Sequence, residues 1–78
     1  MTTLVLWGPA RDAAGVRRAE FDATTVGELI EAARERYGED FARVLASSQI
    51  WLNGDVATND SAVGPYDEVA VLPPISGG

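Results

Sequence analysis

One stretch near the middle of the chain, "TTVGELIEAARERYG" (residues 24–38), limits the possible folds most. Its apolar residues recur at helical spacing and form one stripe, which consists of Val26, Leu29, Ile30, Ala33 and Tyr37. Thr25 and Glu28 have the spacing of a capping box, which starts a helix, and Gly38 suits the position just after its last turn. The rest of the chain therefore has to pack against one amphipathic helix.

Strand patterns precede this helix. Residues 3–7, "TLVLW", are apolar, β-branched or aromatic, and residues 16–22, "VRRAEFD", alternate between polar and apolar. The segment "GPARDAAG" (residues 8–15) between them has glycine and proline at its start and reads as a loop. We expect the two strands to pair as a hairpin with a long connection.

Further elements follow the helix. Residues 39–48 predict a short second helix with Phe41, Val44 and Leu45 turned inward. "QIWL" (49–52) reads as a strand, "NGD" (53–55) as a tight turn and "VAT" (56–58) as the returning strand. An irregular loop leads to the last strand, "EVAVL" (68–72), which ends where two prolines cannot donate to a sheet.

This order predicts an α+β fold of the β-grasp type. A mixed sheet of four to five strands would pack on one main helix, which is about what 78 residues can arrange in two layers. We assign residues 1–72 to the domain and residues 73–78 to an extended tail.

Composition excludes several kinds of chemistry. The chain has no cysteine and no histidine, so it lacks disulfides, thiolate or imidazole metal ligands and the common general base. A net charge of −6 disfavours nucleic-acid binding. No apolar run is long enough to span a membrane, and the first residues lack a basic leader segment, so we expect a cytoplasmic protein.

The predicted strands are apolar on both faces, although the helix can cover one of them. Val5 and Trp7 alternate with Leu4 and Leu6, and Trp51 alternates with Ile50 and Leu52. Either a tryptophan at a strand end is half covered by loops, or Trp7 and Leu72, with Trp51 as a further candidate, form a docking surface.

The chain ends in "PPISGG" (residues 73–78). Pro73 and Pro74 favour an extended exit from the last strand, and the four residues after them can extend about 13 Å. Gly77 and Gly78 give the narrowest possible thread and accept any backbone angles that a partner imposes. Such a tail could place a terminal carboxylate inside the active site of another protein, where adenylation would activate it.

All six basic residues are arginines. One explanation is compositional bias in the source genome. The other is that a chain with an activated terminal acyl group benefits from having no lysine amine to attack it.

Taken together, these motifs resemble the ubiquitin-like sulfur carriers, and most closely the small subunits of molybdopterin synthase. The resemblance covers nearly the whole chain and rests on "LWGPARDAAG", "TTVGELIEAARERYG", "LNGDVA" and above all "DEVAVLPPISGG". Tyr66 stands where the family usually has glycine, which is expected to alter one turn.

The resemblance implies a function for the tail. An E1-like enzyme would use ATP to adenylate Gly78 and would convert it to a thiocarboxylate. This group would donate sulfur to cyclic pyranopterin monophosphate on the large synthase subunit, within a heterotetramer. Pro73, Pro74, Ile75, Ser76 and Gly77 would thread the tail, and Trp7, Arg11, Leu72 and Ile75 would face the partner. The chain itself would be the sulfur-donating subunit of a transferase, with no bound cofactor or metal.

Three other interpretations stay open at this point, and one of them is a plain binding module whose tail has no function. The same terminus could serve a sulfur carrier of another pathway, such as cysteine or thiamine synthesis. It could also be joined to the lysines of target proteins, as in a ubiquitin-like protein modifier.

Overall fold

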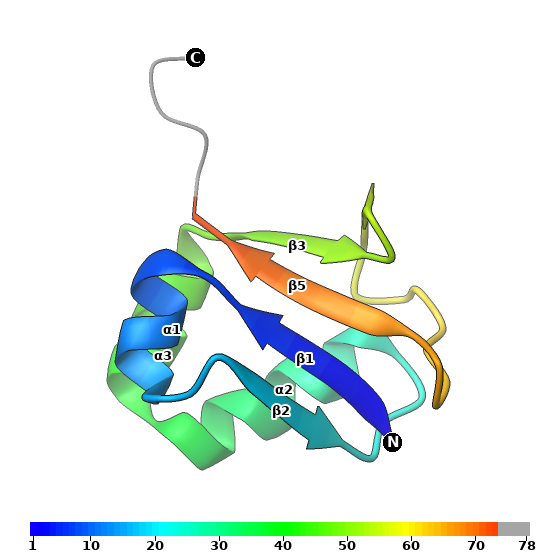
Figure 1. Ribbon diagram of the computed structural model, residues 1–78, viewed down its shortest axis with the longest axis horizontal. Helices are drawn as coiled ribbons and strands as arrows, with labels where there is room; N and C mark the ends of the chain where they lie inside the picture. The colour runs from blue at the N-terminus through cyan, green and yellow to red at the C-terminus, as the bar shows by residue number, and fades with distance from the viewer. Residues whose placement is uncertain (74–78) are drawn as a thin grey trace.

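The computed structural model describes residues 1–73 and contains five strands and three helices in that range (Figure 1). In chain order the elements are β1 (Thr2–Leu6), α1 (Gly8–Ala14), β2 (Arg18–Phe21), α2 (Val26–Tyr37), α3 (Glu39–Ala46), β3 (Gln49–Leu52), β4 (Asp55–Val56) and β5 (Glu68–Leu72). The mixed sheet and the long helix confirm the predicted β-grasp fold.

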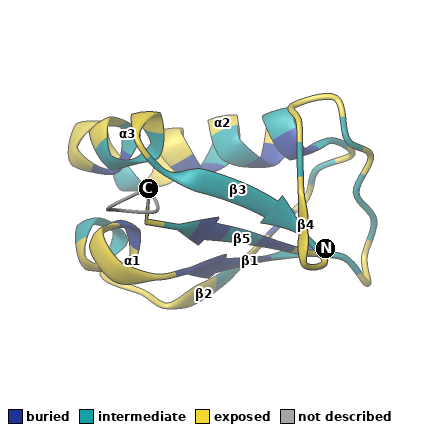
Figure 2. Cartoon of the chain, turned by 90° about the horizontal axis from the view of Figure 1, so that it is seen from above, coloured by how far each residue is buried: buried dark blue, intermediate teal, exposed yellow. Residues whose placement is uncertain are grey.

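The strands lie in the order β2-β1-β5-β3-β4. β1 and β5 are parallel neighbours at the centre, with Leu4 beside Val69 and Leu6 beside Val71, and the remaining pairs are antiparallel. Helices α2 and α3 cover one face of this sheet, and α1 packs at the end of it where β1 and β5 finish (Figures 1 and 2). None of the elements within residues 1–73 covers the other face.

The core lies between the sheet and the helices. Its buried members are apolar side chains from six elements: Leu4, Leu6, Ala10, Phe21, Val26, Leu29, Ala33, Phe41, Val69 and Val71. Ile30 and Tyr37 of the predicted helical stripe, and Val44 and Leu45 of α3, are partly buried against it. Tyr37 also packs edge-to-face on Phe41, with ring centroids 5.1 Å apart. The predicted inward faces of both helices are therefore confirmed.

Both ends of α2 follow the sequence pattern, with one difference at the start. The Thr25 hydroxyl accepts a hydrogen bond from the Glu28 N–H at 3.2 Å, as a capping box requires. The Glu28 carboxylate, however, reaches back to the N–H and hydroxyl of Thr24, both at 2.8 Å. Gly38 ends the helix at φ = 92°, a backbone angle that favours glycine.

The prediction that residues 8–15 form a loop was wrong, because residues 8–14 form helix α1. Pro9 lies in its first turn, where a missing N–H costs nothing, and three alanines favour the helical backbone. Gly15 ends it with a left-handed φ of 78° and donates its N–H to the Arg11 carbonyl. Burial of Ala10 against the core stabilises this short helix.

Three strand boundaries also differ from the prediction. β1 runs from Thr2 to Leu6, since Trp7 is already the residue that caps α1. β2 begins only at Arg18, after the turn that leaves α1. The tight turn consists of Asn53 and Gly54, both with positive φ, so that Asp55 already pairs with Leu52 in the returning strand. The predicted bounds of β3 and β5 are confirmed.

The loop after β4 is fixed to the first turn of α2. The N–H groups of Val26 and Gly27 donate to the carbonyls of Ser61 and Asn59, each at 2.9 Å. These bonds satisfy two of the backbone donors that a helix start leaves open. A Cβ atom on Gly27 would lie only 3.1 Å from the Asn59 carbonyl oxygen, so the loop approaches closely because this residue is glycine.

Within residues 1–73, none of the helices has both the length and the apolar character that a membrane crossing requires.

The close approach at Gly27 gives a stability prediction. Gly27→Ala should lower the free energy of unfolding by about 1 kcal/mol, because overpacking against a backbone carbonyl outweighs the better helix propensity of alanine. Gly27→Val should cost more, since its side chain is larger. Urea unfolding followed by tryptophan fluorescence would measure both. A Gly27→Ala variant more stable than the wild type would contradict this prediction, because it would show that the loop at Asn59 can move away without loss of stability.

The bonds to Glu28 predict an acid-dependent contribution to stability. Hydrogen bonds from the Thr24 N–H, and then from its hydroxyl, lower the pKa of Glu28 below its usual 4.5. A lowered folded-state pKa adds stability above the unfolded-state value, and this is lost as the pH falls through the folded-state value. The wild type should therefore have a higher free energy of unfolding than Glu28→Gln near neutral pH, and this difference should shrink below pH 4.5. Urea unfolding from pH 3 to 7, roughly spanning this range, would measure it; a difference independent of pH would contradict it.

Candidate functional site

The parallel pairing of β1 with β5 determines where the tail leaves the domain. Because the two strands run in the same direction, both finish at the same end of the sheet (Figure 1). The Trp7 N–H extends their ladder by donating to the Val71 carbonyl at 3.1 Å. Trp7 and the start of α1 therefore lie beside Leu72 and Pro73, the last strand residue and the first residue of the tail.

The uncovered side of the sheet carries a group of apolar side chains, which we call the outer face. Alternation along the strands and the pairing register place its members on the side opposite the core: Val5, Trp7, Trp51, Val56, Ala70 and Leu72. One row runs across the sheet from Val5 through Ala70 and Trp51 to Val56. The outer face thus reaches from the middle of the sheet to the exit of the tail.

Much of this outer face is accessible to a partner. Trp7 is 43% exposed and Val56 75% exposed, while Trp51, Ala70 and Leu72 are half-buried. Trp51 donates its indole N–H to the Gln49 side chain at 3.0 Å, which satisfies its polar atom within one strand. Val5 is only 6% exposed, since Arg18 and Ala70 flank it on the neighbouring strands. An exposed apolar group of this kind is typical of a protein-binding surface.

Gly8, the first residue of α1, lies beside Pro73, where the tail begins. It has φ = 54°, a left-handed angle that lets the chain turn from β1 straight into α1. A Cβ atom there would lie 3.6 Å from the Pro73 ring, which is ordinary contact distance. The backbone angle therefore explains the glycine, and Pro73 lies against the first turn of α1.

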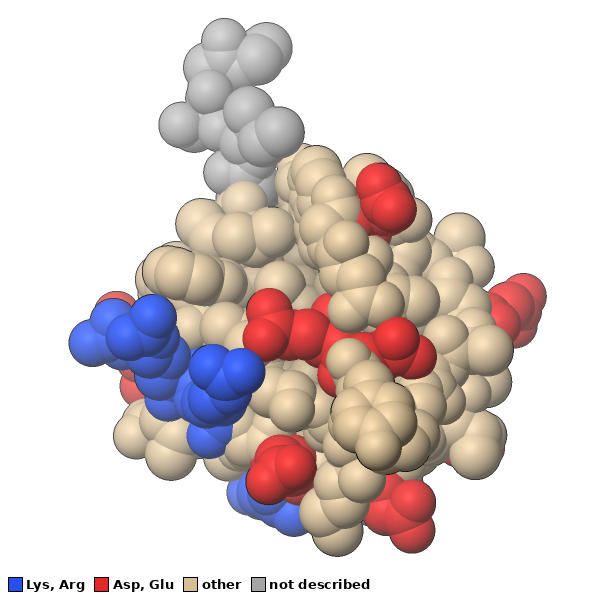
Figure 3. All heavy atoms as spheres, turned by 45° about the vertical axis from the view of Figure 1, so that its right-hand side comes forward, with Lys and Arg blue, Asp and Glu red and all other residues tan. Residues whose placement is uncertain are grey.

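Arginines lie beside the outer face at this end. The Arg17 guanidinium lies 5.5 Å from the centroid of the Trp7 ring, within the range of a cation–π contact. Arg18 pairs with Glu68 at 3.1 Å across β1, and both side chains are exposed. In Figure 3 the basic side chains gather at the left and lower left of the view, and acidic side chains form separate patches at the centre, right and bottom.

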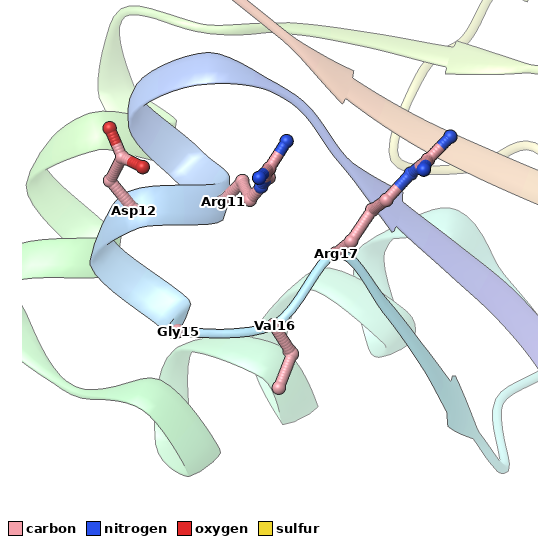
Figure 4. A pocket seen from close by; sticks show the side chains of 5 residues that line it. All are labelled: Arg11, Asp12, Gly15, Val16 and Arg17. Carbon is pink, nitrogen blue, oxygen red and sulfur yellow. The ribbon is translucent and has the colours of Figure 1, made fainter.

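Arg11 lies on α1 rather than on a loop. It lines a hollow of about 400 Å³ together with Arg17, Asp12, Gly15 and Val16. Arg11 and Arg17 rise on the same side of the chain, whereas Asp12 lies on the far flank of α1 and Val16 points away (Figure 4). Arg11 therefore shares a hollow with Arg17, and the Arg17 guanidinium lies over the Trp7 ring.

The predicted site residues divide into two groups. Trp7, Leu72 and Pro73 lie at the end of the sheet where β1 and β5 finish, and Arg11 lies in the last turn of α1 beside it. Pro74, Ile75, Ser76, Gly77 and Gly78 lie outside the described residues. Contact of any of these residues with a partner stays a prediction.

The sequence did not single out Arg17 or Val56. Arg17 joins the site because the Gly15 turn returns the chain from α1 to β1, where the Leu6 N–H donates to the Arg17 carbonyl at 2.8 Å. The sequence does contain a signal for helix α1, which leads to Arg17. Residues 8–15 have proline near the start and glycine at the end, as is typical of a short helix.

Comparison with known proteins agrees with this arrangement. The model of the ThiS family matches residues 4–78. A putative molybdopterin converting factor, subunit 1, from Pyrococcus furiosus is 26% identical, with a TM-score of 0.84 over 95% of this chain and 97% of that one. SAMP1, a small archaeal modifier protein of Haloferax volcanii, is 28% identical, with a TM-score of 0.79 over 99% of this chain and 98% of that one.

A third likeness extends the comparison of fold. Subunit 1 or 2 in the complex of the Helicobacter pylori molybdopterin-converting factor matches at 22% identity, with a TM-score of 0.75 over 99% of this chain and 97% of that one. At this identity the match supports the fold alone. Because the family match spans almost the whole sequence, including the tail, the chain belongs to the ThiS family of ubiquitin-like sulfur carriers.

Proposed function

We propose that the protein carries sulfur on Gly78. The carboxylate of Gly78 attacks the α-phosphate of ATP in an E1-like enzyme, which releases pyrophosphate and leaves an acyl adenylate. Sulfide then attacks the acyl carbon and AMP leaves, so that one oxygen of the carboxylate is replaced by sulfur. The observation that carries the proposal is the outer face, which continues up to Leu72, where the tail leaves the sheet.

This division of labour suits the residues present. The sequence contains no cysteine or histidine, so the chain has few groups of its own for covalent chemistry. The activating enzyme supplies ATP and the catalytic groups, while the carrier supplies its terminus and a surface for recognition. Apolar side chains such as Trp7 and Leu72 favour binding because they lose contact with water in the complex.

For the destination of the sulfur we propose molybdopterin synthesis. The protein would bind a large synthase subunit in a heterotetramer and donate its sulfur to cyclic pyranopterin monophosphate. The closing segment "DEVAVLPPISGG" and the likeness to the Pyrococcus furiosus protein support this pathway.

Protein modification is the second candidate. The likeness to SAMP1 of Haloferax volcanii, a small archaeal modifier protein at 28% identity, specifically favours it. Here an amine of a target protein, rather than sulfide, would displace AMP from the same activated terminus. The two functions share the first step and differ in the nucleophile.

The first test follows the fate of Gly78. Protein purified from its host should contain a fraction heavier by one oxygen-to-sulfur exchange, and incubation with the activating enzyme, ATP and sulfide should increase that fraction. Intact-mass spectrometry would measure it. Deletion of Gly78, or addition of one alanine after it, should abolish the exchange and the activity of molybdenum enzymes in cells.

The outcomes separate the candidates. No exchange after incubation with all components would overturn the sulfur-carrier proposal. A ladder of high-mass conjugates on a blot, lost on deletion of Gly78 while molybdenum enzymes stay active, would instead establish the modifier.

The second test addresses the outer face. Trp7→Ala should raise the KM of the activating enzyme for the carrier roughly 10- to 30-fold with little change in kcat, since a large aromatic anchor at an interface commonly contributes about 2 kcal/mol. Pyrophosphate release would measure it. Tyr66→Ala is the matched control, because Tyr66 is a 98% exposed aromatic residue outside the outer face. Equal effects of both substitutions would contradict a docking role for the outer face.

A further inference from the structure

Two arginines beside the outer face have no acidic partner among residues 1–73. In that range, arginine and carboxylate groups pair at Arg18–Glu68, Arg34–Glu31 and Arg43–Asp40, and neither Arg11 nor Arg17 takes part. The chain carries twice as many acidic as basic residues, 12 against 6. Within residues 1–73, Arg11 and Arg17 therefore line one hollow without a carboxylate in ion-pair contact, although acidic residues are in surplus.

The local fold places both groups on one hollow. Arg11 stands on the last turn of α1, and the Gly15 turn brings Arg17 back toward β1. The hollow between them has a volume of about 400 Å³, and both guanidinium groups rise on the same side of it (Figure 4). Asp12 also lines the hollow, but it lies on the opposite flank of α1 in the same view.

Arg17 is partly held in position before any partner binds. Its guanidinium lies over the Trp7 ring at 5.5 Å, and its backbone carbonyl accepts the Leu6 N–H at 2.8 Å. A side chain that is already ordered loses less conformational entropy when it binds. The contact with Trp7 also joins the hollow to the outer face, so that one partner could cover both.

We infer that Arg11 and Arg17 form a clamp for a carboxylate-bearing segment of the protein that docks on the outer face. Guanidinium groups bind carboxylates through paired hydrogen bonds, and the hollow offers room for an acidic side chain. A nucleic acid does not suit the site, since its many phosphates would meet a protein of net charge −6. A partner protein that brings only one or two carboxylates would interact mainly with the positive potential of Arg11 and Arg17, and less with the net negative charge.

The inference rests on the proposed function only for the identity of the partner. It assigns the clamp to docking, and it assigns no part in the chemistry at Gly78. Arg17 accordingly acts together with Trp7, and Arg11 acts from α1, as determinants of which acidic segments are accepted.

The test uses the full chain and a defined probe. The peptide acetyl-(Glu)4-amide is titrated into ¹⁵N-labelled protein, and the side-chain Nε–Hε signals of the arginines are followed by NMR. The signals of Arg11 and Arg17 should shift most, whereas acetyl-(Gln)4-amide should leave them unchanged. The double variant Arg11→Gln/Arg17→Gln should bind the Glu peptide about fivefold more weakly, as expected from the loss of two exposed charge pairs.

The matched control removes the same charge elsewhere. Arg34→Gln/Arg43→Gln changes two exposed arginines on α2 and α3, and it should keep the affinity of the wild type. Unchanged backbone signals of the core would verify that both variants fold. If both double variants bound the Glu peptide equally more weakly than the wild type, the effect would come from net charge alone, and the clamp would be overturned.

Two further results would also overturn it. One is the absence of shifts at Arg11 and Arg17 with the Glu peptide. The other is inorganic phosphate that binds these arginines more tightly than the peptide, which would make the hollow a phosphate site. Since the titration needs no activated terminus, a failed clamp and a failed sulfur carrier are separate outcomes.

Discussion

The hydrogen-bonded parallel pair of β1 and β5 is the interaction on which the other features depend. It joins the first and last strands of the domain at the centre of the sheet, between β2 on one side and β3 on the other. Its four core side chains, Leu4, Leu6, Val69 and Val71, are completely buried. Because parallel strands cannot be joined by a tight turn, the helices and β3–β4 have to lie in the connection between them. The same pairing brings the end of β1 and the exit of the tail together.

Side-chain hydrogen bonds at the start of β5 fix the register of this strand in the sheet. The Asn53 side chain accepts from the Glu68 N–H and donates to Asp67, each at 2.9 Å, and Asp67 accepts from the Gly64 N–H at 2.7 Å. A shift of β5 by one residue would turn its core valines to the outer face and break these bonds. This register determines that Leu72 faces outward at the last strand position and that Pro73 follows beside Gly8. The position of Leu72 and Pro73 at one end of the sheet thus depends on hydrogen bonds at the other end.

The sequence predicted the fold because its strongest patterns coincide with buried elements. The capped stripe of α2 and the alternation in β5 each have a periodicity that one secondary structure satisfies. Helix α1 was missed because glycine and proline dominate its start and its two turns are too short to show a stripe. Arg17 could not be assigned from sequence, since its position depends on the Gly15 turn and on the ring of Trp7. Local signals predicted the elements, and tertiary contacts determined the neighbours at the site.

The end of the sheet where the tail leaves combines two kinds of surface with different physical effects. In the proposed docking, apolar contact through Trp7 and Leu72 would contribute affinity by burying area, but it would discriminate little between partners of similar shape. Exposed arginines contribute little affinity each, yet they speed the approach of acidic partners and disfavour basic ones. In the proposed function, the carrier would bind its activating enzyme, release it, and then bind the acceptor of its sulfur. Moderate apolar burial with arginines at its side suits such exchange better than a larger apolar surface, because association stays fast while dissociation is not slowed.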